Sequence, residues 1–139
     1  EGDDFPNEEI NLLVEGADYG WLVESPGDPN PEGTEAPVAT WTPHSSVNGM
    51  TTRPANLPGD NHTVYATVYG SRAILLPKGH QILKIDFTLT DDGWVGDVEV
   101  FASDVGTPLP ITGGPDGNLY YATFDRGGSV HVISPEANP

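Results

Sequence analysis

Two adjacent acids, Glu8 and Glu9, open the segment NEEINLLVEGADYGW, which spans residues 7 to 21. Their carboxylates repel each other, so either the pair lies on a solvated strand edge or it shares a bound cation. Hard cations take carboxylate and backbone carbonyl oxygens, and the acid-and-glycine turn that follows supplies carbonyls of this kind. A bound cation would also remove the repulsion between the two acids. The residue types are therefore compatible with a cation site and with a solvated edge.

The chain has no cysteine, which excludes a disulfide framework. Its four histidines, His44, His62, His80 and His131, are isolated along the sequence, and lone histidines are usually structural or solvated. None of the four is expected to act as a catalytic base.

The charge balance excludes whole classes of partner. The 139 residues carry 21 acids against 5 lysines and arginines, a net charge of −16. This charge repels nucleic acid and anionic membranes, and no apolar run is long enough to span a bilayer. It suits a secreted cation-binding protein or one adapted to high salt, where screening weakens self-repulsion. Neither a signal peptide nor an initiator methionine is visible, which suggests a processed chain. Asn61-His62-Thr63 is a glycosylation sequon, a tripeptide that is common by chance.

Short alternating or β-branched runs and the absence of helical periodicity predict an all-β, loop-rich protein. The segment 24–37, ESPGDPNPEGTEAP, is too rich in proline, glycine and acids for a strand and is expected to be a long surface loop. The predicted strands are Ile10–Val14, Val47–Thr52, Thr63–Tyr69, Gln81–Leu89, Val95–Ala102, Leu109–Thr112, Leu119–Phe124 and Ser129–Ile133.

These strands form a weak internal repeat. Residues 47–106 fit a four-stranded meander with glycine turns, and residues 107–139 repeat the pattern with three strands. Repeated four-stranded meanders are typical of β-propeller blades, and a last blade without its outer strand is typical of ring closure. A small β-sandwich is the competing fold. The propeller interpretation gives a first region at 1–46, a blade at 47–106 and a closing blade at 107–139.

Three segments resemble the glucose/sorbosone dehydrogenase family, soluble sugar dehydrogenases that use pyrroloquinoline quinone (PQQ). They are GDDFPNEEINLLVEGADYGW, WTPHSSVNGM and GPDGNLYYATFDRGGSVHVI. The resemblance implies a six-bladed propeller of which this chain is the C-terminal third. It also places the family's catalytic histidine upstream, so no catalytic residue is expected within the chain.

The resemblance further implies a set of ligand contacts. Glu9 would supply a carboxylate and Tyr19 a backbone carbonyl to a calcium ion, with Glu8 as a further candidate. Lys78 and His44 fall at cofactor-binding positions, although Lys78 is also compatible with an ordinary turn lysine. PQQ carries three carboxylates and needs cations in its site. One branch of the family has an Arg-x-Arg pair where this chain has Thr107-Pro108-Leu109, and this difference weakens the expectation of PQQ binding.

Two functions from different classes follow. The first is a secreted or periplasmic, PQQ-dependent aldose dehydrogenase. In such an enzyme, the sugar transfers a hydride to the quinone, and calcium polarises the quinone. The second is a non-catalytic, calcium-stabilised extracellular propeller module for binding or self-assembly, as a ring or filament. In either case, the expected partners are the rest of a propeller chain or further copies of this one. The acidity fits a saline habitat.

Overall fold

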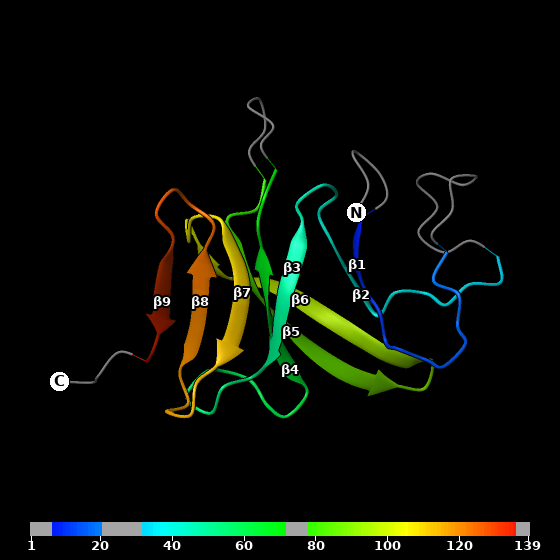
Figure 1. Ribbon diagram of the computed structural model, residues 1–139. Coiled ribbons are helices and arrows are strands. Elements are labelled where there is room, and N and C mark those ends of the chain that lie inside the picture. Colours follow the sequence, from blue (N-terminus) through cyan, green and yellow to red (C-terminus); the bar gives the residue numbers. More distant parts are fainter. Residues whose placement is uncertain (1–6, 21–31, 72–77, 136–139) are drawn as a thin grey trace.

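A computed structural model describes residues 7–20, 32–71 and 78–135. These residues form an all-β structure in which no helix occurs (Figure 1). No described segment is therefore a helix that could cross a membrane. The strands are β1 (Glu8–Ile10), β2 (Ala39–Trp41), β3 (Val47–Thr52), β4 (Thr63–Val68), β5 (Gln81–Thr90), β6 (Gly93–Ser103), β7 (Pro108–Gly113), β8 (Leu119–Thr123) and β9 (Ser129–Ile133).

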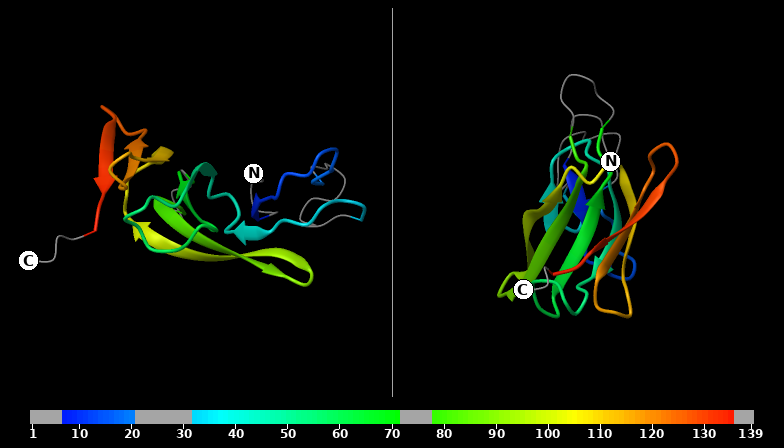
Figure 2. Two further views of the ribbon diagram at one scale, coloured as in Figure 1. Left: turned by 90° about the horizontal axis from the view of Figure 1, so that it is seen from below. Right: turned by 90° about the vertical axis from the view of Figure 1, so that its left-hand side faces the viewer.

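The strands form three antiparallel sheets in chain order. β1 pairs with β2, β3 to β6 form a four-stranded meander, and β7 to β9 form a three-stranded one. The sheets follow one another across the molecule without closing into a ring (Figure 2). This arrangement confirms the all-β, antiparallel blade fold expected from the repeat, and it is a piece of a propeller. A single small sandwich is not what these strands form.

The first predicted strand is wrong, and one strand was missed. Ile10–Val14 was expected to be extended, but β1 covers Glu8–Ile10, and Leu12, Leu13 and Val14 are exposed in the loop beyond it. β1 ends there because its only described partner, β2, is three residues long. The missed strand is β2. Ala39–Trp41 is too short for its sequence to show the alternation that marks a strand. The bounds of β3 and β9 agree with the prediction.

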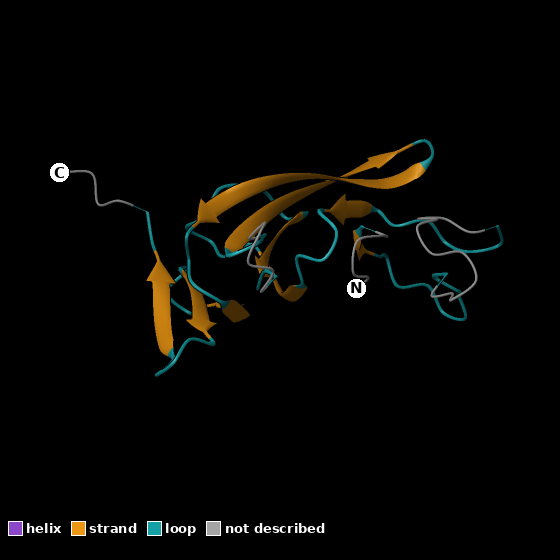
Figure 3. Ribbon diagram, turned by 90° about the horizontal axis from the view of Figure 1, so that it is seen from above, coloured by secondary structure: helices purple, strands orange, loops and turns teal. Residues whose placement is uncertain are grey.

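Two hydrophobic cores hold the sheets together. The first lies between the β1–β2 sheet and the four-stranded sheet and contains Ile10, Ala39, Ala66, Val68, Leu83 and Ile85. The second lies between the four-stranded and three-stranded sheets and contains Leu57, Tyr65, Ile82, Leu119 and Tyr121. The four-stranded sheet is therefore covered on both faces, which explains why the adjacent residues Ile82 and Leu83 of β5 are both fully buried. Seen from above, the long β5–β6 hairpin extends past β2 (Figure 3).

The two blades approach closely where β3 and β4 of the first meet β7 of the second. The Thr67 hydroxyl on β4 donates a 2.6 Å hydrogen bond to the Leu109 carbonyl on β7, and it accepts one of 2.9 Å from the Gly49 N–H. A Cβ on Gly49 would lie 2.4 Å from the Leu109 carbonyl oxygen. Only glycine fits at this point of β3, so Gly49 is what allows β3 and β7 to come this close.

The registers show how the two blades correspond. Thr51 pairs with Tyr65 in one blade and Thr112 with Tyr120 in the other, so Tyr65 and Tyr120 are equivalent. The same alignment matches Ile82 on β5 with Val130 on β9. Ile82 is fully buried against the next sheet, whereas Val130 is 77% exposed. The outward face of the three-stranded sheet therefore has no neighbour among the described residues.

Candidate functional site

The strand directions bring most of the predicted site residues to one end of the sheets. β3, β5, β7 and β9 begin at this end, while β4, β6 and β8 finish there. The connections 42–46, 69–71, 78–80, 104–107 and 124–128 therefore gather at the top of Figure 1. These connections are called the upper loops below.

The carboxylate of Glu8 fixes the first upper loop. Its Oε1 atom accepts hydrogen bonds from the backbone N–H groups of Ser45 at 3.0 Å and Ser46 at 2.9 Å. His44 and Ser46, on either side of Ser45, both have a left-handed backbone, with φ of 55° and 59°. Glu8 is only 7% exposed, so these N–H groups take the place of water as hydrogen-bond donors to its side chain. The loop is held in a conformation that non-glycine residues rarely adopt.

The structure brings the two predicted cofactor residues, Lys78 and His44, to the same place. The Nζ atom of Lys78 donates a 3.1 Å hydrogen bond to the carbonyl oxygen of Pro43, the residue before His44. Its backbone carbonyl accepts from the Ser71 N–H at 3.0 Å, which joins the segments 69–71 and 78–80. Lys78 thus places a cation beside His44, which a ligand carrying carboxylates requires.

His80 connects the upper loops of the two blades. Its Nδ1 atom lies 2.8 Å from the Gly106 carbonyl oxygen. A carbonyl only accepts, so Nδ1 carries the proton. The Thr107 hydroxyl, one residue further on, donates a 2.7 Å hydrogen bond to the Asp125 carboxylate. This bond, more than any other cause, lowers the pKa of Asp125. An ionised acid therefore stands beside the segment 107–109, where one branch of the resembled family carries arginines.

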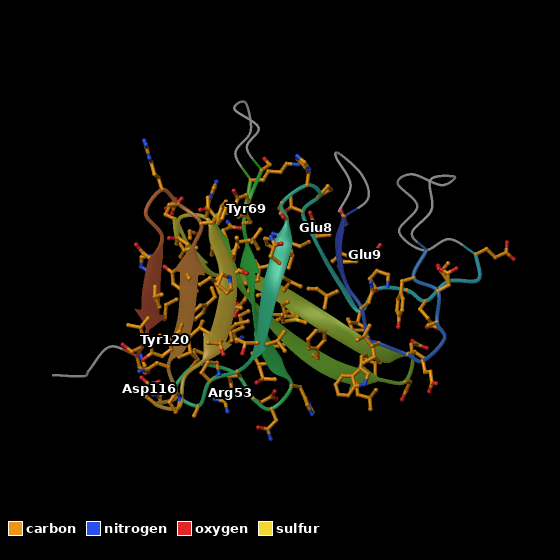
Figure 4. All side chains as sticks on the ribbon, viewed as in Figure 1. Glu8, Glu9, Arg53, Tyr69, Asp116 and Tyr120 are labelled. Atoms are coloured by element: carbon orange, nitrogen blue, oxygen red, sulfur yellow. The ribbon has the colours of Figure 1, made fainter. Side chains whose placement is uncertain are left out.

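The predicted calcium ligands are not brought together by their side chains. Glu8 and Glu9 are consecutive on β1, so their side chains point to opposite faces, Glu8 inward and Glu9 to a half-buried position (Figure 4). The Glu9 carboxylate accepts a 3.3 Å hydrogen bond from the Asn11 side chain. The Tyr19 hydroxyl donates to the Leu12 carbonyl and accepts from the Val14 N–H, which ties the loop after β1. Among the described residues, no three histidines or acids cluster as a metal site. The Glu8 carboxylate is engaged with the backbone of Ser45 and Ser46, whereas among the described residues the Glu9 carboxylate is hydrogen-bonded only by the Asn11 side chain.

A second polar region lies at the opposite end of the sheets and was not anticipated from the sequence. Arg53 donates from Nε to the Asp60 carbonyl and from a terminal nitrogen to the carbonyls of Pro54, Ala55 and Leu57. An open cavity of about 570 Å³ lies between this loop and the 114–117 turn. Figure 4 shows Arg53, Asp116 and Tyr120 at this lower end. Arg53 therefore holds its own loop together, and no local pattern in the sequence predicts this role.

With the geometry in view, the fold defines a class, namely part of a β-propeller whose upper loops gather at one end. Similar solved structures are sugar dehydrogenases. A structure described as a glucose dehydrogenase from Thermus thermophilus matches 92% of this chain with 22% identity and a TM-score of 0.63. A second glucose dehydrogenase matches 99% with 26% identity and a TM-score of 0.64. The PQQ domain of pyranose dehydrogenase from Coprinopsis cinerea matches 73% with 17% identity and a TM-score of 0.52.

These similarities confirm the resemblance to part of a PQQ sugar dehydrogenase-like propeller. The chain covers only 36%, 40% and 30% of the three neighbours respectively. No protein-family model matches the chain, and no curated protein matches it in sequence. The neighbours therefore establish the fold of a propeller portion.

Proposed function

We propose that the chain is the C-terminal portion of a secreted PQQ-dependent aldose dehydrogenase, which oxidises a sugar by hydride transfer to the quinone. The observation that carries the proposal is that nearly all of the chain has the fold of glucose dehydrogenases. The placement of Lys78 beside His44 at the upper loops supports it, because a tricarboxylate cofactor needs a fixed cation there.

Within this proposal each described residue has a limited role. Lys78 and His44 would contact the carboxylates of PQQ, and Glu8 would hold their loop in shape through Ser45 and Ser46. When bound, PQQ supplies the hydride acceptor. The catalytic base is expected outside residues 1–139. Calcium at Glu9 and the Tyr19 carbonyl, with Glu8 less suited, would stabilise the first part of the chain.

The test is to titrate residues 1–139 with PQQ and calcium and to follow the quinone absorption. We expect saturable binding that Lys78→Ala weakens at least tenfold and Lys78→Arg partly restores, because arginine keeps the cation. Lys84→Met is the matched control, since Lys84 lies in an ion-pair cluster within the four-stranded sheet. The same chain should show no PQQ-dependent glucose oxidation, because the base is absent. Absence of PQQ binding would contradict the proposal, and turnover by the chain alone would contradict the placement of the base.

A specific observation favours a second function. Where one branch of the resembled family has two arginines, this chain has Thr107 hydrogen-bonded to the Asp125 carboxylate. An anion at that position opposes a tricarboxylate. The alternative is a non-catalytic, calcium-stabilised extracellular module that binds the rest of a propeller or further copies of itself. Calcium-dependent assembly without any PQQ binding would support this alternative.

A further inference from the structure

Two aromatic side chains from different blades meet at the upper loops. The ring centroids of Tyr69 and Phe124 lie 6.4 Å apart, and the ring planes are tilted by 53°. Tyr69 directly follows β4, and Phe124 directly follows β8. Because Tyr65 and Tyr120 are equivalent in the two registers, Tyr69 and Phe124, each four residues further on, are equivalent as well. Each blade thus presents an aromatic ring at the same point of the upper end.

The backbones of both residues are fixed by neighbouring upper loops. The Tyr69 N–H donates to the Ser46 carbonyl at 2.9 Å, and the Phe124 N–H donates to the Thr107 carbonyl at 2.8 Å. Ser46 belongs to the loop that Glu8 holds and that Lys78 contacts. Despite this anchoring, Phe124 is 66% exposed. An exposed aromatic ring on an anchored backbone can bury apolar surface against a ligand.

The polar groups around the pair indicate which ligand would fit. Asp125 follows Phe124, and its carboxylate is held by Thr107. Hydrogen bonding from Thr107 keeps the pKa of Asp125 low, so the group is an anionic acceptor at neutral pH. The hydroxyl groups of a neutral sugar can donate to this carboxylate. Sites of this kind combine an apolar wall with a few oriented polar groups.

We propose that Tyr69 and Phe124 form an aromatic platform against which the ring of a neutral pyranose packs, with Asp125 accepting a sugar hydroxyl. The platform rests on the proposed function, since it names where that enzyme holds its sugar. It makes no use of the cofactor contacts at Lys78 and His44. Binding of sugar and binding of quinone can therefore be measured separately.

The experiment is saturation-transfer NMR on residues 1–139 with D-glucose as the probe, with far-UV circular dichroism to confirm folding of each variant. We expect transfer to the ring protons of glucose in the wild-type chain. Phe124→Ala should reduce it at least threefold, Tyr69→Leu should also reduce it, and Phe124→Tyr should retain it. The matched control is Leu89→Ala, which removes a side chain that is 63% exposed near the end of β5, the end away from the upper loops.

Each outcome bears on the proposal. No transfer to glucose in the folded wild-type chain would overturn it, as would undiminished transfer in folded Phe124→Ala. An equal loss in Leu89→Ala would also overturn it, because it would show unspecific contact with exposed apolar surface. If PQQ binds but glucose does not, only the platform fails. If glucose binds with the expected variant pattern but PQQ does not, the platform stands and the dehydrogenase assignment fails.

Discussion

The carboxylate of Glu8 and the backbone of Ser45, 37 residues apart in the sequence, form a buried hydrogen bond of 3.0 Å. Through this bond and its companion to Ser46, the first strand sets the shape of the loop that leads into β3. The structural role of Glu8 thus differs from that of its neighbour Glu9, although both were candidates for the same cation.

The first prediction concerns this bond. Glu8→Ala leaves two N–H groups without their acceptor, so we expect a loss of about 2–3 kcal/mol in the free energy of unfolding. Glu8→Gln keeps one carbonyl acceptor and should lose less. Urea denaturation measures both, with Glu15→Ala on the exposed loop as the control. Equal stability of Glu8→Ala and the wild-type chain would show that the bond contributes nothing.

The second prediction concerns calcium. If Glu9 and the Tyr19 carbonyl hold the ion, a chelator should lower the melting temperature, because a ligand that binds only the folded state stabilises it. Glu9→Ala should abolish this sensitivity. Glu8→Gln should keep it if the Glu8 carboxylate serves only Ser45 and Ser46. Differential scanning calorimetry with and without chelator makes the measurement, and an unchanged melting curve would remove the site.

The third prediction tests how the blades pack. Gly49→Ala would place a Cβ 2.4 Å from the Leu109 carbonyl, so β3 and β7 must separate. We expect a destabilisation of about 1–3 kcal/mol, the usual cost of overpacking. Gly113→Ala on β7 is the matched control, because its Cβ would meet only Pro54 at an ordinary 3.5 Å. Equal melting temperatures for the two variants would show that β3 and β7 do not approach as closely as described.

Local sequence patterns predicted most strands. Strand ends and side-chain contacts that depend on residues far apart in the sequence could not be predicted in this way. β3 and β9 were predicted to the residue, as their runs lie between clear turns. The apolar run after Ile10 is not a strand, because β2 does not continue beside it and the run has no described partner strand. The partnership of Glu8 with Ser45, and that of His80 with Gly106, join residues far apart that no local pattern relates. The proximity of Lys78 and His44 was implied by family resemblance.

The fourth prediction concerns acid stability. The Asp86 carboxylate accepts hydrogen bonds from Lys84 and, at 2.6 Å, from the Thr63 hydroxyl. The bond from Lys84, followed by that from Thr63, lowers the pKa of Asp86 below its ordinary 3.8. A lowered pKa in the folded state gives stability that is present above the unfolded pKa and is lost as the pH falls through the folded value. The chain should therefore lose stability below about pH 4.

Asp86→Asn should remove the part of the stability loss at low pH that comes from the Asp86 carboxylate. The variant should be less stable than the wild-type chain at about pH 6, and the difference should shrink toward about pH 2.5. The effect will be modest, because Asp86 is partly exposed and water screens the ion pair. Melting temperatures across this range make the comparison, with Asp92→Asn on the exposed β5–β6 turn as the control. A pH-independent difference would show that Asp86 acts through packing alone.

The last prediction concerns the open side of the three-stranded sheet. Val130 and Val132 are exposed on β9, while Ile82, the equivalent of Val130, is fully buried against the next blade. β9 also has a free edge, because among the described strands it pairs only with β8. Exposed edges and apolar sheet faces recruit further strands. We expect β9 to pair with a strand from outside residues 1–139 or from a second copy of the chain.

For residues 1–139 in isolation, the second copy is the available partner. Light scattering should give a mass above that of a 14.8 kDa monomer, increasing with protein concentration. The double variant Val130→Lys with Val132→Lys should return the chain to a monomer, because charge on this face opposes burial. Leu89→Lys, on the exposed β5–β6 hairpin, is the control and should leave association unchanged. A wild-type chain that stays monomeric at high concentration would contradict pairing through β9, since both its edge and its apolar face would then be stable in water.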